Sequence, residues 1–145
     1  MPTQYAIKIV DAFTTQPFAG NACAVVTHAE GLSDEQMQTV AREMNLSETA
    51  FVTPSSLADF RVRFFTPGAE IPLAGHPTIA TMHALAEEGR IDVPGTGSAN
   101  VTQELNVGVL PVSLQATPAG VLVTMTQATP GFSTEIPAGS MAEAL

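Results

Sequence analysis

Short strands dominate the pattern of apolar and polar positions along the chain. Residues 59–65 alternate strictly, which places Phe60, Val62 and Phe64 on a buried face and the two intervening arginines on a solvated face. Runs of β-forming residues predict further strands at residues 5–13, 23–26, 49–52, 101–105, 110–115 and 121–126. The sequence Thr-Pro-Ala-Gly at residues 117–120 is typical of a turn and predicts a hairpin of the last two strands.

Two segments have the pattern of helices. In residues 34–44 apolar side chains recur at helical spacing behind a capping box of Ser33 and Gln36. Residues 78–88 are apolar nearly all round, which is typical of a helix buried on most sides, and Gly89 suits its C-terminal end. We therefore expect an α+β fold in which the strands wrap around a central buried helix at about residues 78–88.

The composition narrows the class of protein. The 145 residues are 45% hydrophobic, enough for a buried core, and no apolar run approaches the ~18 residues of a membrane span. A formal net charge of −9, with five Lys and Arg residues and no basic cluster, excludes nucleic acid and anionic membranes as partners. The single cysteine, Cys23, excludes an internal disulfide, and the N-terminus shows no secretory leader. We expect a soluble, cytoplasmic protein.

One candidate site lies at the start of the second helix. Gly75-His76-Pro77-Thr78 opens that helix, where unpaired N–H groups and the helix dipole favour a small anion such as a carboxylate. Gly75 has no Cβ and would let a ligand approach the backbone closely. A plain helix start, capped by water or by its own side chains, explains the same residues.

Other candidate groups lie in the first half of the chain. Glu48 follows the first helix and precedes a strand, where a carboxylate would be partly desolvated as a general base requires; a solvated surface glutamate is the alternative. Asn21, in a Gly-Asn turn, could orient a substrate or cap its own loop. Cys23 has no cationic neighbour and is better explained as structural. His76 and His83 are too far apart on one helix to share an ion readily, so we expect no metal site.

Several separated motifs carry a resemblance to a known family. They are Asp11-Ala12-Phe13, Pro17-Phe18-Ala19-Gly20-Asn21, Ala24-Val25-Val26, Asn45-Leu46-Ser47-Glu48-Thr49-Ala50-Phe51-Val52, Phe64-Phe65-Thr66-Pro67, Glu70-Ile71-Pro72-Leu73 and Ala74-Gly75-His76-Pro77-Thr78. In order and spacing they resemble the PhzF-like family of phenazine biosynthesis, relatives of diaminopimelate epimerase. The likeness continues more weakly to about Phe132.

This resemblance implies an α+β fold of the diaminopimelate epimerase type, with two similar lobes and the active site in the cleft between them. In each lobe an antiparallel, barrel-like sheet would be rolled around a central buried helix, here at about residues 78–88. It implies an isomerase that shuttles a proton on a small carboxylate-bearing substrate without cofactor or metal. The glutamate of its S-E-T motif, here Glu48, would be the general acid/base. Gly75 and His76 would hold the substrate's carboxylate, with Asn21 and Ser47 as further substrate-binding residues.

The chain departs in two ways from the family that it resembles. The epimerase relatives use paired thiols, and Ala74 stands where one of them would be, which favours a single carboxylate base. Members of the family are about twice as long, so we expect residues 1–130 to form the N-terminal lobe and residues 131–145 to begin the connection to a second lobe. A capping box of Ser140 and Glu143 predicts a helix start in that connection.

We expect a homodimer when the protein is complete. The alternative is a non-catalytic small-molecule-binding or scaffold domain that keeps the fold.

Overall fold

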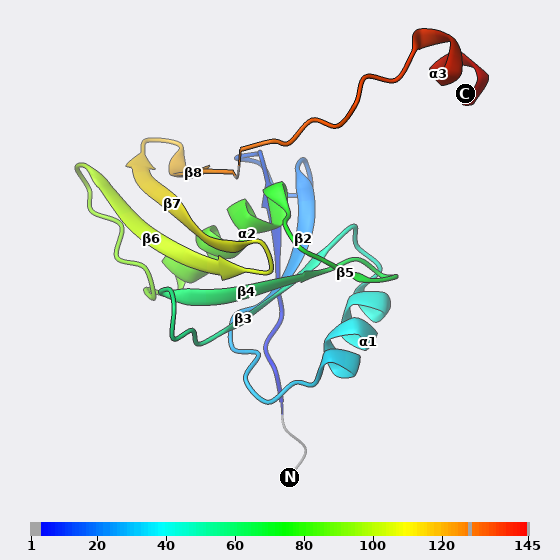
Figure 1. Cartoon of the computed structure of the whole chain (residues 1–145). Helices are drawn as coiled ribbons and strands as arrows, with labels where there is room; N and C mark the ends of the chain where they lie inside the picture. The colour runs from blue at the N-terminus through cyan, green and yellow to red at the C-terminus, as the bar shows by residue number, and fades with distance from the viewer. Residues whose placement is uncertain (1–3, 128, 145) are drawn as a thin grey trace.

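One curled sheet forms most of the computed structural model, which describes residues 4–127 and 129–144 (Figure 1). Along the chain its strands are β1 (Lys8–Ala12), β2 (Asn21–Val26), β3 (Thr49–Thr53), β4 (Phe60–Phe65), β5 (Glu70–Ile71), β6 (Ser98–Leu105), β7 (Gly108–Thr117) and β8 (Gly120–Met125). Their order in the sheet is β1-β2-β3-β4-β6-β7-β8, and the short β5 pairs with β4. The predicted hairpin of the last two strands is confirmed, since Thr117 pairs with Gly120.

The sheet is mixed, so the prediction of an antiparallel sheet is wrong in two places. β2 and β3 run parallel, with Ala24 opposite Thr49, and β4 and β6 run parallel, with Phe60 opposite Gln103. Parallel neighbours need a long crossover connection, usually with a helix. Both connections here are of that kind, because each contains one of the two helices of the sheet region.

Helix α1 (Asp34–Met44) has the bounds that the sequence predicts. Ser33 caps it: the Ser33 hydroxyl accepts from the Gln36 N–H at 3.2 Å, and the Gln36 side chain accepts from the Ser33 N–H at 2.9 Å. The helix ends at Asn45, whose φ of 51° is left-handed. Its buried residues pack on the outer face of the sheet in a small cluster made of Val26, Ala29, Met37, Ala41, Phe51 and Phe65.

This outer cluster changes the interpretation of the alternating strand. Phe65 is buried beneath α1, and the Arg63 side chain is only 16% exposed. Arg63 donates to both carboxylate oxygens of Glu70, at 2.8 Å each, and to Asp34 at 2.6 Å. The prediction of a solvated arginine face is therefore wrong for Arg63, because the first turn of α1 and β5 cover that face.

Helix α2 (Gly75–Glu87) begins three residues earlier than predicted and ends one residue earlier. The expected bounds of 78–88 placed Gly75 and His76 before the helix, whereas both lie in its first turn. Pro77 permits this, because the first-turn N–H groups have no partner within a helix and a proline there removes nothing. Gly89 follows the helix with a φ of 70°, as its predicted role at the C-terminal end requires.

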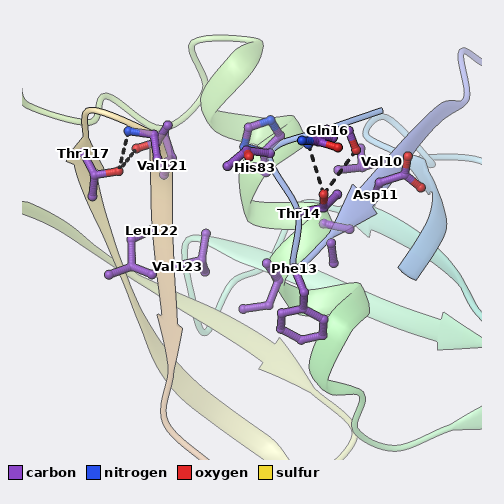
Figure 2. A pocket seen from close by; sticks show the side chains of 16 residues that line it. Val10, Asp11, Phe13, Thr14, Gln16, His83, Thr117, Val121, Leu122 and Val123 are labelled. Atoms are coloured by element: carbon purple, nitrogen blue, oxygen red, sulfur yellow. Dashed lines mark hydrogen bonds between the residues drawn. The ribbon is translucent and has the colours of Figure 1, made fainter. Parts of the chain in front are cut away.

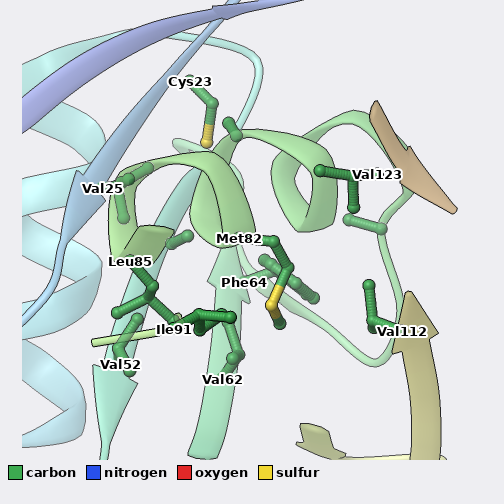
Figure 3. Packing of buried hydrophobic residues seen from close by; sticks show 14 of the residues in the cluster. Cys23, Val25, Val52, Val62, Phe64, Met82, Leu85, Ile91, Val112 and Val123 are labelled. Atoms are coloured by element: carbon green, nitrogen blue, oxygen red, sulfur yellow. The ribbon is translucent and has the colours of Figure 1, made fainter. Parts of the chain in front are cut away.

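The main hydrophobic core lies between α2 and the inner face of the sheet (Figure 3). Met82 and Leu85 of α2 are fully buried. Six strands contribute buried residues to the same cluster, namely Cys23, Val25, Ala50, Val52, Val62, Phe64, Leu105, Val112, Leu114 and Val123. The helix therefore has strand residues on several sides, which explains why its sequence has almost no polar face.

The C-terminal segment leaves the sheet after β8 and runs away from the rest of the molecule (Figure 1). It ends in α3 (Ala138–Ala144), which begins before Ser140, so Ser140 lies inside the helix and is not its N-terminal cap. The side chain of Glu143, the partner in the predicted capping box, lies outside the described residues. The division of the chain at residue 130 stays a prediction. Among the described residues, no helix is long and apolar enough to cross a membrane.

Candidate active site

Glu48 and His76, which are far apart in the sequence, lie side by side in the fold. Glu48 directly precedes β3, and His76 is the second residue of α2. Glu48 Oε2 lies 3.4 Å from His76 Nε2. The Glu48 side chain is 20% exposed and the His76 side chain 10% exposed, so the pair lies largely inside the protein.

Neither of the two facing atoms is satisfied by the protein. Glu48 Oε2 and His76 Nε2 are both buried, and neither forms a hydrogen bond with any described residue despite their close approach. Buried side-chain polar atoms in proteins are nearly always hydrogen-bonded, and exceptions occur at reactive sites. The pair is thus a carboxylate and an imidazole held together with capacity left for a third group.

The start of α2 adds backbone donors to this place. The residue before the helix is Ala74, which makes no side-chain cap, so no side chain of the helix start occupies the first N–H groups. The Thr78 hydroxyl donates to the Ala74 carbonyl at 2.8 Å instead. Gly75 is exposed, and a Cβ built on it would meet no atom within 4 Å. The space outside the helix start is therefore open to a ligand.

The other two predicted substrate-binding residues lie near the same end of the strands. Asn21 is the first residue of β2, and Ser47 lies two residues before β3 begins. Because β2 and β3 are parallel neighbours, both strands begin at the same end of the sheet. Both residues are exposed, and within the described part of the chain neither side chain forms a hydrogen bond to the facing atoms of Glu48 and His76. Their role in binding stays a prediction.

Cys23 lies in the inner core, close enough to Glu48 for that charge to act on its thiol. The register that pairs Ala24 with Thr49 brings the preceding residues of the two strands to the same level. Cys23 is completely buried, and burial, together with the neighbouring Glu48 charge, raises the pKa of its thiol to about 12. A thiol in this setting is neutral and unreactive, in agreement with the structural role expected for it.

A separate cavity of about 730 Å³ lies away from this pair (Figure 2). It is formed by the end of β1 and the loop after it, by Ile79, Ala80 and His83 of α2, and by the turn before β8 and the strand itself. Neither Glu48 nor His76 lines it. Sequence reasoning missed it because its walls come from the first and last strands of the sheet, which no local pattern brings together.

Within the described part of the chain, no three His, Cys, Asp or Glu side chains are grouped as metal ligands.

Comparison with known proteins identifies a family and several relatives that this chain resembles. The model of the PhzC-PhzF family, described as phenazine biosynthesis-like protein, matches residues 10–145. The chain is 43% identical over 123 residues to the uncharacterized isomerase YddE of Escherichia coli O157:H7, an alignment that covers 85% of this chain and 40% of that protein. It is 42% identical over 108 residues to the trans-2,3-dihydro-3-hydroxyanthranilate isomerase of Pseudomonas aeruginosa, covering 74% of this chain and 36% of that one.

A solved structure shows the same fold. The Bacillus anthracis phenazine biosynthesis protein of the PhzF family superposes with a TM-score of 0.75 at 38% identity, covering 82% of this chain and 39% of that chain. The chain spans about 40% of the length of the curated relatives that it matches first. The likeness thus extends over most of this chain and over less than half of each relative.

Proposed function

This chain belongs to the PhzC-PhzF family of phenazine biosynthesis-like proteins, and we propose that it carries the acid/base part of an isomerase active site. In this proposal Glu48 is the general acid/base, and His76 with the first backbone N–H groups of α2 binds the carboxylate of a small substrate. The reaction is a proton shift between two carbons of a conjugated acid, with no net oxidation or reduction.

The observation that carries the proposal is the unsatisfied pair. Glu48 Oε2 and His76 Nε2 are buried, 3.4 Å apart and without hydrogen bonds to described residues. A carboxylate that only stabilised the fold would be satisfied by its neighbours, as Glu70 is by Arg63. A carboxylate that must accept a proton from a substrate needs a free oxygen in a sheltered place.

The proton shift needs only one base, because the group that removes the proton also returns it. Glu48 takes a proton from one carbon, and the electron pair of that C–H bond moves into the conjugated system of the substrate. The protonated Glu48 then returns the proton to the other end of that system, which restores the carboxylate. His76 Nε2 lies 3.4 Å from the same oxygen, has no hydrogen bond to a described residue, and can donate to a substrate oxygen.

The helix start accounts for substrate binding in a chain with few cations. Four of the five Lys and Arg residues have other partners. Arg61 and Arg63 form ion pairs with Glu104 and Glu70, and Lys8 forms ion pairs with Glu87 and Glu88. Arg90 donates to the Thr27 carbonyl. Backbone N–H groups at the start of a helix bind carboxylates without a positive side chain. Gly75 leaves the approach to them open.

The complete site extends beyond this chain in the proposal. The curated relatives are about two and a half times as long as the aligned part, since the alignments cover 40% of their length. We propose that a second lobe closes over Glu48 and His76 and completes the substrate contacts, so that the isolated 145 residues bind substrate weakly and turn it over slowly. Exclusion of water by that closure would strengthen the interactions of the buried pair.

Isotope exchange tests the role of Glu48. The protein that carries this chain is incubated in D2O with the compound that names the Pseudomonas aeruginosa relative, trans-2,3-dihydro-3-hydroxyanthranilate. Isomerisation is followed by chromatography and deuterium incorporation by mass spectrometry, and either one reports removal of the proton from carbon. Glu48→Gln keeps the shape of the side chain and removes the base, so we expect exchange to fall about 10²- to 10⁴-fold. Glu70→Gln is the matched control, and it should exchange at the parental rate.

The outcomes separate the two candidate roles. Exchange by Glu48→Gln at the parental rate would show that Glu48 is not the base. Binding of the compound with neither isomerisation nor exchange in the parental protein would favour the non-catalytic binding domain. His76→Asn should weaken binding more than it slows exchange at saturation, because a residue that binds the carboxylate contributes to the ground state as well.

A further inference from the structure

Helix α2 begins with fewer free backbone donors than an ordinary helix. Pro77 has no N–H, and the Thr78 N–H donates to the Ala74 carbonyl as the first hydrogen bond within the helix. The first turn can therefore offer a ligand the N–H groups of Gly75 and His76. In the proposed function these groups hold the substrate's carboxylate, so the direction in which each of them points matters.

The peptide between Ala74 and Gly75 sets the direction of the first of these donors. The peptide is trans and planar, so the Gly75 N–H points opposite to the Ala74 carbonyl. That carbonyl points into the helix, and the N–H therefore points out of the helix start. Because glycine adopts both signs of φ, this peptide could turn over more easily than one that precedes a residue with a Cβ.

The Thr78 hydroxyl holds this peptide from the inside. It donates to the Ala74 carbonyl at 2.8 Å, which gives the carbonyl a second donor from the same residue. Thr78 is fully buried and Ala74 is 8% exposed, so water does not compete for the bond. At α1 the cap works the other way, because the Ser33 hydroxyl accepts from the Gln36 N–H and uses up a first-turn donor. At α2 the hydroxyl binds the carbonyl and leaves the Gly75 N–H free.

We propose that Thr78 is a positioning residue of the active site: its hydroxyl locks the Ala74–Gly75 peptide so that the Gly75 N–H stays aimed at the substrate's carboxylate. This role rests on the proposed function, in which the start of α2 binds that carboxylate. The same helix start presents a buried side-chain atom to a ligand besides its backbone, since His76 Nε2 has no hydrogen bond to any described residue.

Thr81 of the same helix supplies a matched control. It is fully buried, as Thr78 is, but its hydroxyl forms no hydrogen bond with any described residue. Valine in place of either threonine keeps the branching at Cβ and removes the hydroxyl. Thr78→Ser keeps the hydroxyl and loses only a methyl group. Thr78→Ala, which places no group against the Ala74 carbonyl, is a second variant without the hydroxyl and should agree with Thr78→Val.

Steady-state kinetics of the protein that carries this chain test the role, with trans-2,3-dihydro-3-hydroxyanthranilate as substrate. We expect Thr78→Val to raise KM about 10-fold, the effect of losing one hydrogen bond to a charged group, with kcat changed less than about 3-fold. Thr78→Ser should return KM to within about 2-fold of the parental value, and Thr81→Val should leave KM unchanged. A role in helix stability alone would reduce the amount of active protein, and so kcat, without raising KM.

A measurement at the peptide itself does not depend on turnover. Labelling with ¹³C-carbonyl alanine and ¹⁵N-glycine selects the N–H groups of Ala-Gly peptides in an NMR spectrum, and the signal lost in Gly75→Ala is that of the Ala74–Gly75 peptide. Sodium benzoate is titrated as a simple carboxylate, with benzamide as its uncharged analogue. We expect benzoate, and not benzamide, to shift this signal. The benzoate dissociation constant should be about 10-fold higher in Thr78→Val and unchanged in Thr81→Val.

The outcomes separate the role of Thr78 from the proposed function. The same KM and the same benzoate dissociation constant in Thr78→Val as in the parental protein would overturn the role of Thr78 and leave the carboxylate site in place. Equal losses in Thr78→Val and Thr81→Val would also overturn it, because they would reflect the packing of the helix. A Gly75 signal that benzoate does not move in the parental protein would overturn the carboxylate site, and the role of Thr78 with it. Isotope exchange by Glu48→Gln tests the base separately.

Discussion

Glu48 and Glu70 have similar exposure and opposite surroundings. The Glu48 side chain is 20% exposed and the Glu70 side chain 26% exposed. Glu70 accepts two hydrogen bonds from Arg63 and one from Asn106, whereas Glu48 Oε2 faces His76 and accepts none from the described residues. Burial alone therefore does not separate a structural carboxylate from the one that we propose as the acid/base. The difference lies in whether the protein itself uses up the oxygen atoms.

The two surroundings also differ in what covers them. The Arg63 group lies on the outer face of the sheet and joins β4, β5 and the first turn of α1, and the guanidinium also lies 5.2 Å from the centre of the Phe65 ring. The Glu48 group lies at the start of α2 and the edge of the inner core, beside an open helix start. We therefore expect changes at the first group to alter stability and changes at the second to alter chemistry.

The largest expected effect concerns Cys23, the neighbour of Glu48. Burial, with the Glu48 charge, raises the pKa of this thiol from 9.0 to about 12, so at pH 8 its thiolate fraction is roughly 10³-fold below that of an ordinary thiol. Reaction with Ellman's reagent should be slow in the folded protein and rapid in guanidinium. Stoichiometric labelling of the folded protein within minutes would show that the thiol beside Glu48 is not buried as described.

Arg63→Met should destabilise the protein by about 2 kcal/mol, measured as the free energy of unfolding in urea. The substitution leaves Glu70 and Asp34 without their cation and removes the contact with the Phe65 ring. Arg61→Met is the matched control, because Arg61 lies in the same strand but is 32% exposed. A loss at Arg61 equal to the loss at Arg63 would remove the distinction between a covered and a solvated arginine.

Glu70→Gln should destabilise by about 1 kcal/mol at pH 7, and the difference should shrink in acid. Hydrogen bonds from Arg63 hold the pKa of Glu70 below its ordinary value of 4.5. Its contribution is therefore complete above that value and is lost as the pH falls through the lowered pKa. Urea unfolding between pH 7 and pH 3 measures this, and the difference between the two proteins should not grow toward low pH. In the Arg63→Met background the difference should be much smaller at every pH.

Glu48→Gln should change the free energy of unfolding by less than about 0.5 kcal/mol, the smallest effect of the series. The protein makes no hydrogen bond to Glu48 Oε2, so replacing the carboxylate by an amide of the same shape removes little. Urea unfolding at pH 7 of the parental protein, Glu48→Gln and Glu70→Gln measures the two losses side by side. A loss at Glu48 as large as that at Glu70 would mean that Glu48 is a structural carboxylate, and the contrast between the two would disappear.

Local sequence predicted the elements whose signals lie within a few residues. Ser33 and Gln36 start α1 where expected, because a capping box satisfies donors only three residues apart. The Thr117–Gly120 turn and the end of α2 before Gly89 follow from the backbone preferences of proline and glycine. β5 was missed, since two residues carry no periodic pattern, and its pairing with β4 depends on Phe64 and Phe65.

The sequence by itself determined the family motifs, the apolar all-round character of α2 and the residue types of the candidate site. Only the tertiary structure decided that Glu48 and His76 meet, that neither finds another partner among the described residues, and that Arg63 is covered. The reason is distance along the chain. Motif and helix signals are written in neighbouring residues, whereas the parallel pairing of β2 with β3 and the packing of α2 against them depend on contacts between segments that the chain brings together only by folding.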